Sequence, residues 1–299
     1  MQWGFILSIF LRPTFYINVL RATVPVTLPA IGEVIGERAG VVNIALEALI
    51  VLGAATSVYV GLRTGVLGLA ILAGLAVGVL VGLIHAAIAV YLKGDQIVDG
   101  IGINMFADGF AIVSMAIAYG MYGTSPSLPP EVRVPGIYGI SPFALAMIAI
   151  GIISWYALEK TKWGLRLRAV GEDPVAADAA GINVFVLRTI AAVIASVLAA
   201  AGGVFLGLDW LGACSKYVSA GRGFIALALV VFSRWNPFLA LLGGLIFGFT
   251  YALSLSIPSG LVPDQVLYVL PYLVTLLIAA GFLGGARPPA SCGKPYERI

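Results

Sequence analysis

Residues 66–92 read VLGLAILAGLAVGVLVGLIHAAIAVYL, and this stretch contains no lysine, arginine, aspartate or glutamate. A helix of about 20 apolar residues is long enough to cross the roughly 30 Å of hydrocarbon in a bilayer. The stretch is apolar on every side, whereas a strand of a membrane β-barrel alternates apolar and polar residues. Val66–Leu92 therefore predicts a membrane-spanning helix.

The rest of the chain extends this pattern. Hydrophobic residues make up 61% of the sequence and charged residues 10%, with a mean hydropathy of +1.05. A soluble domain usually has about a quarter of its residues charged. We therefore expect an all-α, polytopic integral membrane bundle of about 8–10 transmembrane helices, in the cell membrane. The expected spans are Phe15–Glu33, Val41–Leu62, Val66–Leu92, Gln96–Tyr122, Ser141–Leu158, Val186–Leu208, Pro237–Ser256 and Asp264–Leu283.

One apolar stretch, Phe224–Phe232, is too short to cross a bilayer unaided. It is typical of a half-helix or a re-entrant segment, ended by the sequence RWNP at 234–237. Glycines recur every four residues at Gly74, Gly78 and Gly82, which predicts close packing between helices.

The basic residues indicate the orientation of the chain, because cytoplasmic loops carry an excess of lysine and arginine. Their distribution predicts that the connector 159–185 and the tail 285–299 lie in the cytoplasm. It leaves the orientation of the N-terminus open. We expect one transmembrane domain that comprises residues 1–299.

A first group of polar residues interrupts the apolar pattern in the sequence EVIGERAGVVNIALE at 33–47. On a helix, Asn43 and Glu47 would share one face. Polar residues inside a membrane usually meet a partner or face a cavity or pathway. Glu37 and Arg38 stand at an interfacial break, where the arginine can neutralise the carboxylate. The group either holds the helix entry through an ion pair or lines a translocation path, with Asn43 and Glu47 as its candidate residues.

A second polar group lies in the sequence DQIVDGIGINMFAD at 95–108. Its side chains spread over about half the circumference of a helix, which is wider than one ion-binding stripe. Two interpretations stay open, hydrogen bonds between helices and the wall of a solute cavity. Gln96, Asp99 and Asn104 are therefore further candidates for the translocation path. His85, the single histidine, is expected to pack or to make one interhelical hydrogen bond.

Motifs of catalysis are absent from the sequence. It contains no Gly-x-Ser-x-Gly, no His-Glu-x-x-His and no phosphate-binding loop of the form Gly-x-x-x-x-Gly-Lys-Ser/Thr. Cys214 and Cys292 are expected on opposite sides of the membrane, and neither has metal-ligand spacing. We expect no enzyme activity, no cofactor and no metal site. If ATP powers transport, another subunit must hydrolyse it.

The connector contains the signals of a short, capped helix. Asp173 can cap the first amides, and Pro174 fits at the first helical position because it lacks an N–H. Gly181 can adopt the left-handed conformation that ends a helix. Arg166 and Arg168, further upstream, can lie at the level of anionic headgroups. The alanine-rich face of this helix is poor for burial in lipid, so it is predicted to dock into a groove of a partner protein.

The connector also resembles the coupling segment of ABC importer permeases, in the branch that includes branched-chain amino acid, ribose and simple-sugar or nucleoside permeases. The tail RPPASCGKPY at 287–296 is similar to tails of the simple-sugar and nucleoside subgroup. The other matching sequences are GLRLRAVGEDP at 164–174, DAAGIN at 178–183, ERAGVVNIALE at 37–47, GRGFIALA at 221–228 and RWNP at 234–237.

The resemblance implies the permease subunit of an importer for a small polar solute, with a nucleoside or simple sugar favoured over a branched-chain amino acid. It implies a cytoplasmic ABC ATPase, a second permease subunit as homo- or heterodimer, and an external substrate-binding lipoprotein, with no nucleic acid. Ala45 and Ala48 stand where the family tends to have glycine. The residues that the resemblance implies in coupling to the ATPase are Arg166, Arg168, Gly171, Asp173, Pro174, Asp178 and Gly181.

The alternative function is a stand-alone secondary transporter coupled to ions or protons. Glu47, Asp99 and Asp108 would then be its titrating groups. The sequence does not identify the solute.

Overall fold

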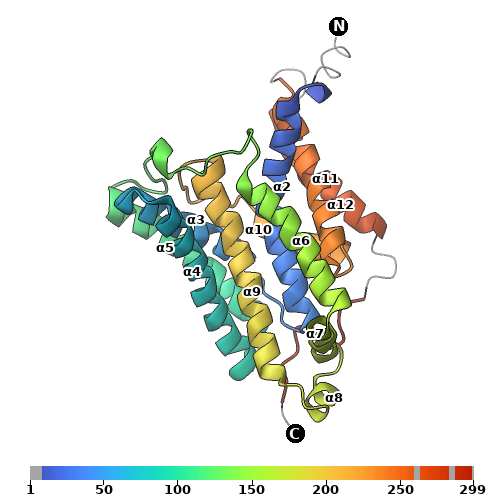
Figure 1. Cartoon of the computed structure of the whole chain (residues 1–299). Helices are drawn as coiled ribbons and strands as arrows, with labels where there is room; N and C mark the ends of the chain where they lie inside the picture. The colour runs from blue at the N-terminus through green and yellow to red at the C-terminus, as the bar shows by residue number, and fades with distance from the viewer. Residues whose placement is uncertain (1–8, 259–262, 283–286, 298–299) are drawn as a thin grey trace.

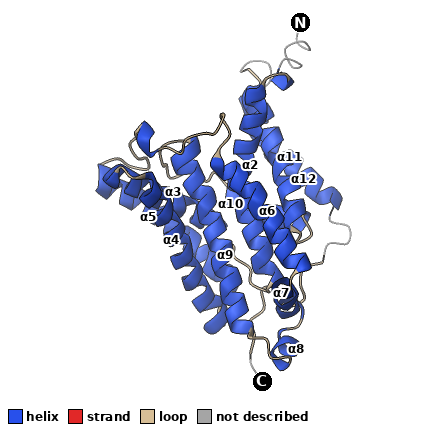
Figure 2. Cartoon of the chain, viewed as in Figure 1, coloured by secondary structure: helices blue, strands red, loops and turns tan. Residues whose placement is uncertain are grey.

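The computed structural model describes residues 9–258, 263–282 and 287–297. These residues form helices and loops, and their only β-pairing is two isolated bridges (Figures 1 and 2). The helices are α2 (Pro13–Arg38), α3 (Leu46–Thr64), α4 (Leu67–Ala86), α5 (Gln96–Tyr119), α6 (Pro142–Lys160), α7 (Lys162–Glu172), α8 (Pro174–Ala179), α9 (Val184–Phe205), α10 (Arg222–Phe232), α11 (Pro237–Ser256) and α12 (Asp264–Phe282).

The described residues contain 7 helices long and apolar enough to span a membrane. These are α2 to α6, α9 and α11, with π-helical turns that extend α4 to Tyr91 and α9 to Trp210. Helix α10 is shorter, with 11 residues, and α12 packs against α10 and α11. The all-α, polytopic membrane bundle is therefore confirmed. Leu283, the expected last residue of the final span, lies outside the described residues, as do both ends of the predicted tail 285–299.

The core of the bundle is built around α2 and α9. Helix α2 is buried along most of its length and packs against α9 and α11. Close approach depends on small residues, because a Cβ on Gly203 of α9 would overlap the carbonyl oxygen of Ile50 in α3. Gly78 and Gly82 of α4 face the backbone of α9 in the same way. The predicted close packing at these glycines is confirmed.

Two of the non-helical segments precede helices that begin inside the bundle. The first, residues 39–45, separates α2 from α3, and Gly40 within it has a φ of +90°. The second, residues 211–221, separates the π-helical end of α9 from α10. Helix α10 has 11 residues, as expected of a half-helix. The predicted span Val41–Leu62 begins only at Leu46, so the expectation that Asn43 and Glu47 share a helix face is wrong.

The C-terminal tail packs against the end of the bundle that carries α7 and α8 (Figure 1). Its contacts converge on Arg188 of α9, whose side chain is buried. The guanidinium donates to the carbonyl oxygens of Ala39 at 3.2 Å and Lys294 at 2.9 Å, and to Ser291 Oγ at 3.1 Å. Ser291 in turn donates from its backbone N–H to the carbonyl oxygen of Gly171 at 3.0 Å. One arginine thus joins α9, the break after α2 and the tail, and the tail reaches α7.

We expect Arg188→Met to destabilise the protein. The substitution leaves three acceptors without their donor, two of them buried, at a cost of about 1–3 kcal/mol for each buried acceptor that is not resatisfied. Thermal unfolding of the detergent-purified protein should therefore begin at a lower temperature, and the tail should be cleaved faster by protease. The control is Arg63→Met, because Arg63 is exposed and makes one long hydrogen bond of 3.4 Å to Ala118. Equal stability of the two variants would contradict the role of Arg188.

Candidate translocation and coupling sites

Glu47 connects the two helices that begin inside the bundle. It lies in the first turn of α3, and its carboxylate accepts the backbone N–H groups of Gly221 and Gly223, both at 2.8 Å. These amides belong to the start of α10, where N–H groups have no partner within the helix and a negative charge is stabilising. A Cβ on Gly223 would overlap the backbone of Glu47, so the two helix starts are in direct contact.

Polar side chains of α5 satisfy the broken segment before α3. Asn104 accepts the N–H of Ala48 at 2.8 Å and donates to the carbonyl oxygen of Ile44 at 3.0 Å. Gln96 accepts the N–H of Val42 at 2.7 Å. The sequence 95–108 left two interpretations open, hydrogen bonds between helices and the wall of a solute cavity. Gln96 and Asn104 make hydrogen bonds to a neighbouring element, as the first interpretation expects.

Asn43 lies within the broken segment and is buried. Its side chain accepts the N–H of Ala45 at 2.9 Å and donates to Ser196 Oγ of α9 at 3.1 Å. Its backbone N–H donates to Glu33 Oε1 at 2.7 Å. Asn43 therefore fixes the path of the chain between α2 and α3.

Among the remaining polar residues of α4 and α5, His85 is buried and Asp108 is exposed. His85 Nδ1 lies 2.6 Å from Asp99 Oδ2, so the interhelical hydrogen bond expected for His85 is confirmed. Asp108 is exposed on α5. The three carboxylates of the secondary-transport alternative, those of Glu47, Asp99 and Asp108, thus do not form one site.

Two glutamates of α2 have partners that the sequence did not reveal. The helix continues past the expected end at Glu33, which is fully buried. Glu37 accepts Trp235 Nε1 at 2.5 Å, and Arg38 Nε donates to the carbonyl oxygen of Trp235 at 2.9 Å. The expected neutralisation of Glu37 by Arg38 is therefore wrong, since both bind the loop after α10. Glu33 and Glu37 are four residues apart, so the sequence does indicate that they share one face of a helix that continues to Glu37.

The connector folds as its capping signals predict. Asp173 accepts the N–H of Ala176 at 3.0 Å with Pro174 at the first helical position, and Gly181 has a φ of +81°. Arg166 is exposed, whereas Arg168 donates to Glu159 at 3.1 Å.

Gly171 and Asp178 occupy different faces of the connector. Gly171 is buried, and a Cβ there would overlap the carbonyl oxygen of Arg38 at the end of α2. Asp178 lines a hollow of about 380 Å³ beside α8, together with Tyr91, Gly181, Ile182, Asn183, Phe185 and Val186. This hollow is a concave surface next to the exposed face of α8.

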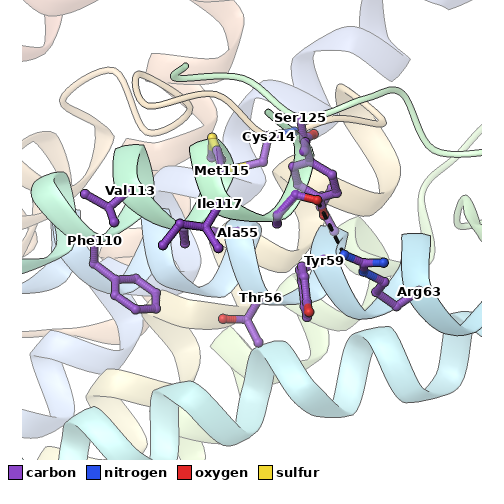
Figure 3. Close-up of a pocket in the computed structure, with 14 residues that line it drawn as sticks. Ala55, Thr56, Tyr59, Arg63, Phe110, Val113, Met115, Ile117, Ser125 and Cys214 are labelled. Carbon is purple, nitrogen blue, oxygen red and sulfur yellow. Dashed lines mark hydrogen bonds between the residues drawn. The ribbon is translucent and has the colours of Figure 1, made fainter. Parts of the chain in front are cut away.

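Two larger cavities lie toward the other end of the bundle. One, of about 520 Å³, is formed by α3, α5 and the following loops, with Tyr59, Arg63 and Tyr119 among its lining residues (Figure 3). The other, of about 480 Å³, lies between the start of α10, the end of α11 and α12. None of Asn43, Glu47, Gln96, Asp99 and Asn104 lines either cavity. Their contact with a solute stays a prediction.

A bundle of apolar helices, two of which begin at broken segments inside it, defines a polytopic membrane protein of the permease class. Residues 15–288 match the family described as branched-chain amino acid transport system / permease component, and the chain belongs to this family. It is a multi-pass protein of the cell membrane, and the predicted resemblance to the nucleoside and simple-sugar subgroup is confirmed.

Relatives match the chain over nearly its whole length. It is 40% identical to the guanosine ABC transporter permease protein NupQ of Bacillus subtilis, over 91% of this chain and 92% of the relative. It is 36% identical to the nucleoside ABC transporter permease protein NupC of Lactococcus lactis, over 93% and 95%. The galactofuranose transporter permease protein YtfT of Escherichia coli is 26% identical over 77% and 69%. No solved structure shows significant similarity.

We expect Glu47→Gln to loosen the contact between α3 and α10. Glutamine can accept one of the two glycine amides, but its NH₂ group faces the other and leaves it unpaired, at a cost of about 1–3 kcal/mol. The variant should unfold at a lower temperature in detergent than the unsubstituted protein. Asp108→Asn, an exposed carboxylate on α5, is the matched control and should unfold normally. A normal unfolding temperature for Glu47→Gln would show that the carboxylate is dispensable for this contact.

Proposed function

We propose that this protein is the membrane permease subunit of an ATP-driven importer for nucleosides. The observation that carries the proposal is the similarity to NupQ and NupC over more than nine-tenths of the chain. Similarity to the putative glucose ABC transporter permease protein TsgC13 of Haloferax volcanii over 89% of this chain supports a simple sugar as the second candidate. The branched-chain amino acid permease LivH of Escherichia coli matches only 47% of this chain, so a branched-chain amino acid is the third candidate. Residues 1–299 would act as one transmembrane domain without enzymatic activity of its own.

The proposed partners follow from this assignment. A cytoplasmic ABC ATPase hydrolyses ATP, an external lipoprotein delivers the solute, and a second permease subunit completes the pathway. The ATPase docks on the surface of α7 and α8, where Val175 and Leu165 are exposed large apolar side chains. Arg166, Arg168, Asp173, Pro174, Asp178 and Gly181 form or shape this surface, and Gly171 joins it to α2.

Transport in this proposal proceeds by alternating access, in which closure of the ATPase domains moves α8 and the bundle rearranges as rigid bodies. The movement reaches the bundle through two contacts, Gly171 against Arg38 and Ser291 against Gly171. Asn43, Glu47, Gln96, Asp99 and Asn104 belong to the framework of the pathway. They hold the starts of α3 and α10 and the contact between α4 and α5 in place.

We expect Arg166→Glu to uncouple ATP hydrolysis from uptake. The side chain is exposed, so charge reversal leaves the fold intact but places a negative charge on the docking surface. The measurement is guanosine uptake and ATPase activity of the assembled importer in proteoliposomes. Uptake should fall at least fivefold while hydrolysis continues.

The matched control for this experiment is Arg12→Glu, because Arg12 is exposed and directly precedes the first residue of α2. Helix α2 starts at the end of the bundle opposite α8 (Figure 1). This variant should transport normally. Normal uptake by Arg166→Glu, with the protein correctly inserted, would exclude a role of Arg166 in docking. Uphill uptake by the purified chain without an ATPase would overturn the proposed function itself.

A further inference from the structure

The cavity between α10, α11 and α12 contains a cluster of aromatic and polar side chains. We call it the tyrosine cavity and define it by Arg222, Tyr251, Tyr268 and Tyr272. Its volume of about 480 Å³ lies within the range of about 300–1,000 Å³ typical of small-molecule sites. Its other lining residues are Ala220, Ser254, Leu255, Ile257, Leu267 and Pro271.

The tyrosine cavity lies at the start of α10, the helix that follows the non-helical segment 211–221. Ala220 and Arg222 flank Gly221, whose amide is bound by Glu47. The cavity is therefore next to the point where α3 and α10 meet inside the bundle. Discontinuous helices of this kind mark substrate sites in many transporters, because irregular backbone is tolerated where it borders a cavity.

Arg222 is held in place by its surroundings and fixes one tyrosine. Its guanidinium donates to the carbonyl oxygens of Val218 at 3.3 Å and Ser219 at 3.1 Å, and to the hydroxyl of Tyr251 at 3.2 Å. It also lies over the ring of Tyr251, 5.4 Å from the centroid. Because the hydroxyl of Tyr251 accepts this bond, its own proton is directed elsewhere and can be donated to a bound molecule.

Tyr272 offers the complementary polar group. Its hydroxyl donates to the carbonyl oxygen of Ala220 at 3.1 Å, so its oxygen can still accept a hydrogen bond from a bound molecule. The rings of Tyr251 and Tyr272 both pack against Phe247, with centroid distances of 6.0 and 6.2 Å. The cavity thus has a rigid aromatic wall with one donor and one acceptor.

Tyr268 supplies the exposed wall of the cavity. Its side chain is 72% exposed and contributes a ring face that is not buried by the protein. The lining includes no carboxylate, and Nη1 and Nη2 of its one charged residue, Arg222, already donate to two backbone carbonyls and to Tyr251. A solute in this cavity is therefore expected to be neutral, flat on one side and able to both accept and donate hydrogen bonds.

We propose that the tyrosine cavity binds the base of the transported nucleoside, an inference that rests on the proposed function. The base stacks on Tyr268 and its polar edge meets the hydroxyls of Tyr251 and Tyr272. A free amino acid fits poorly because the lining offers no carboxylate to pair with its ammonium group. A sugar lacks the π-face that Tyr268 would stack on.

The cavity of Figure 3 provides the comparison site. It is similar in volume and also contains tyrosines, Tyr59 and Tyr119. Its wall includes Phe110, Val113 and Ile117, three exposed apolar side chains of α5. It includes no residue of α10.

The test uses the assembled importer in proteoliposomes, with labelled guanosine, uridine and glucose as probes. Tyr268→Ala should raise KM for guanosine about tenfold, because stacking of a base on an aromatic side chain contributes about 1–3 kcal/mol. Tyr268→Phe keeps the ring and should leave KM within about twofold of the original value. Tyr59→Ala in the comparison cavity should leave KM unchanged.

Three results would overturn the inference. Unchanged KM for Tyr268→Ala, while ATP-dependent guanosine uptake persists, would remove the cavity from the pathway without affecting the proposed function. An equal rise in the KM for guanosine in Tyr268→Phe and Tyr268→Ala would exclude stacking of the base on the ring. ATP-dependent uptake of glucose alone would exclude a nucleoside as the ligand of the cavity and as the solute of the proposed importer. Failure of the unsubstituted importer to take up any probe with ATP would instead overturn the proposed function.

Discussion

The bundle depends on one constraint, that backbone amides exposed at a helix start inside a membrane must find a partner without water. Two breaks create this problem, at residues 39–45 and 211–221. Glu47 solves it for α10 by binding two glycine amides with one carboxylate. Asn104 and Gln96 solve it for the start of α3 and the segment before it. Polar residues that look costly in an apolar span are therefore what permits the breaks.

The same principle operates at the end of the bundle that carries the connector. Arg188 lies within an apolar helix, and its charge is stabilised by two carbonyl oxygens and a serine hydroxyl. Those acceptors come from the break after α2 and from the tail, which are distant in sequence. A buried guanidinium with a hydrogen bond at each of its three nitrogens holds its neighbours in a single arrangement. It makes the tail part of the fold.

Local signals in the sequence predicted more of the structure than long-range ones. Helix α8 was predicted correctly because its cap at Asp173 and its end at Gly181 depend on neighbouring residues. The end of α2 was placed five residues too early, at Glu33, because the partner that permits a buried glutamate, Asn43, is visible only in the folded chain. Asn43 and Glu47 do not share a helix face, because Gly40 adopts a left-handed conformation and the chain becomes helical again only at Leu46. The tyrosine cavity joins three helices, so no single sequence segment indicates it.

The contacts around Gly171 explain how a short surface helix can act on distant membrane segments. Helix α7 has no space to slide past α2, because Gly171 already touches the carbonyl oxygen of Arg38 without a side chain between them. Ser291 binds the carbonyl oxygen of Gly171 from another side and is itself bound by Arg188. Arg38 reaches the loop after α10 through Trp235. A displacement of α7 and α8 would therefore reach the break after α2 and the loop after α10 together, since packed interiors transmit movement rather than absorb it.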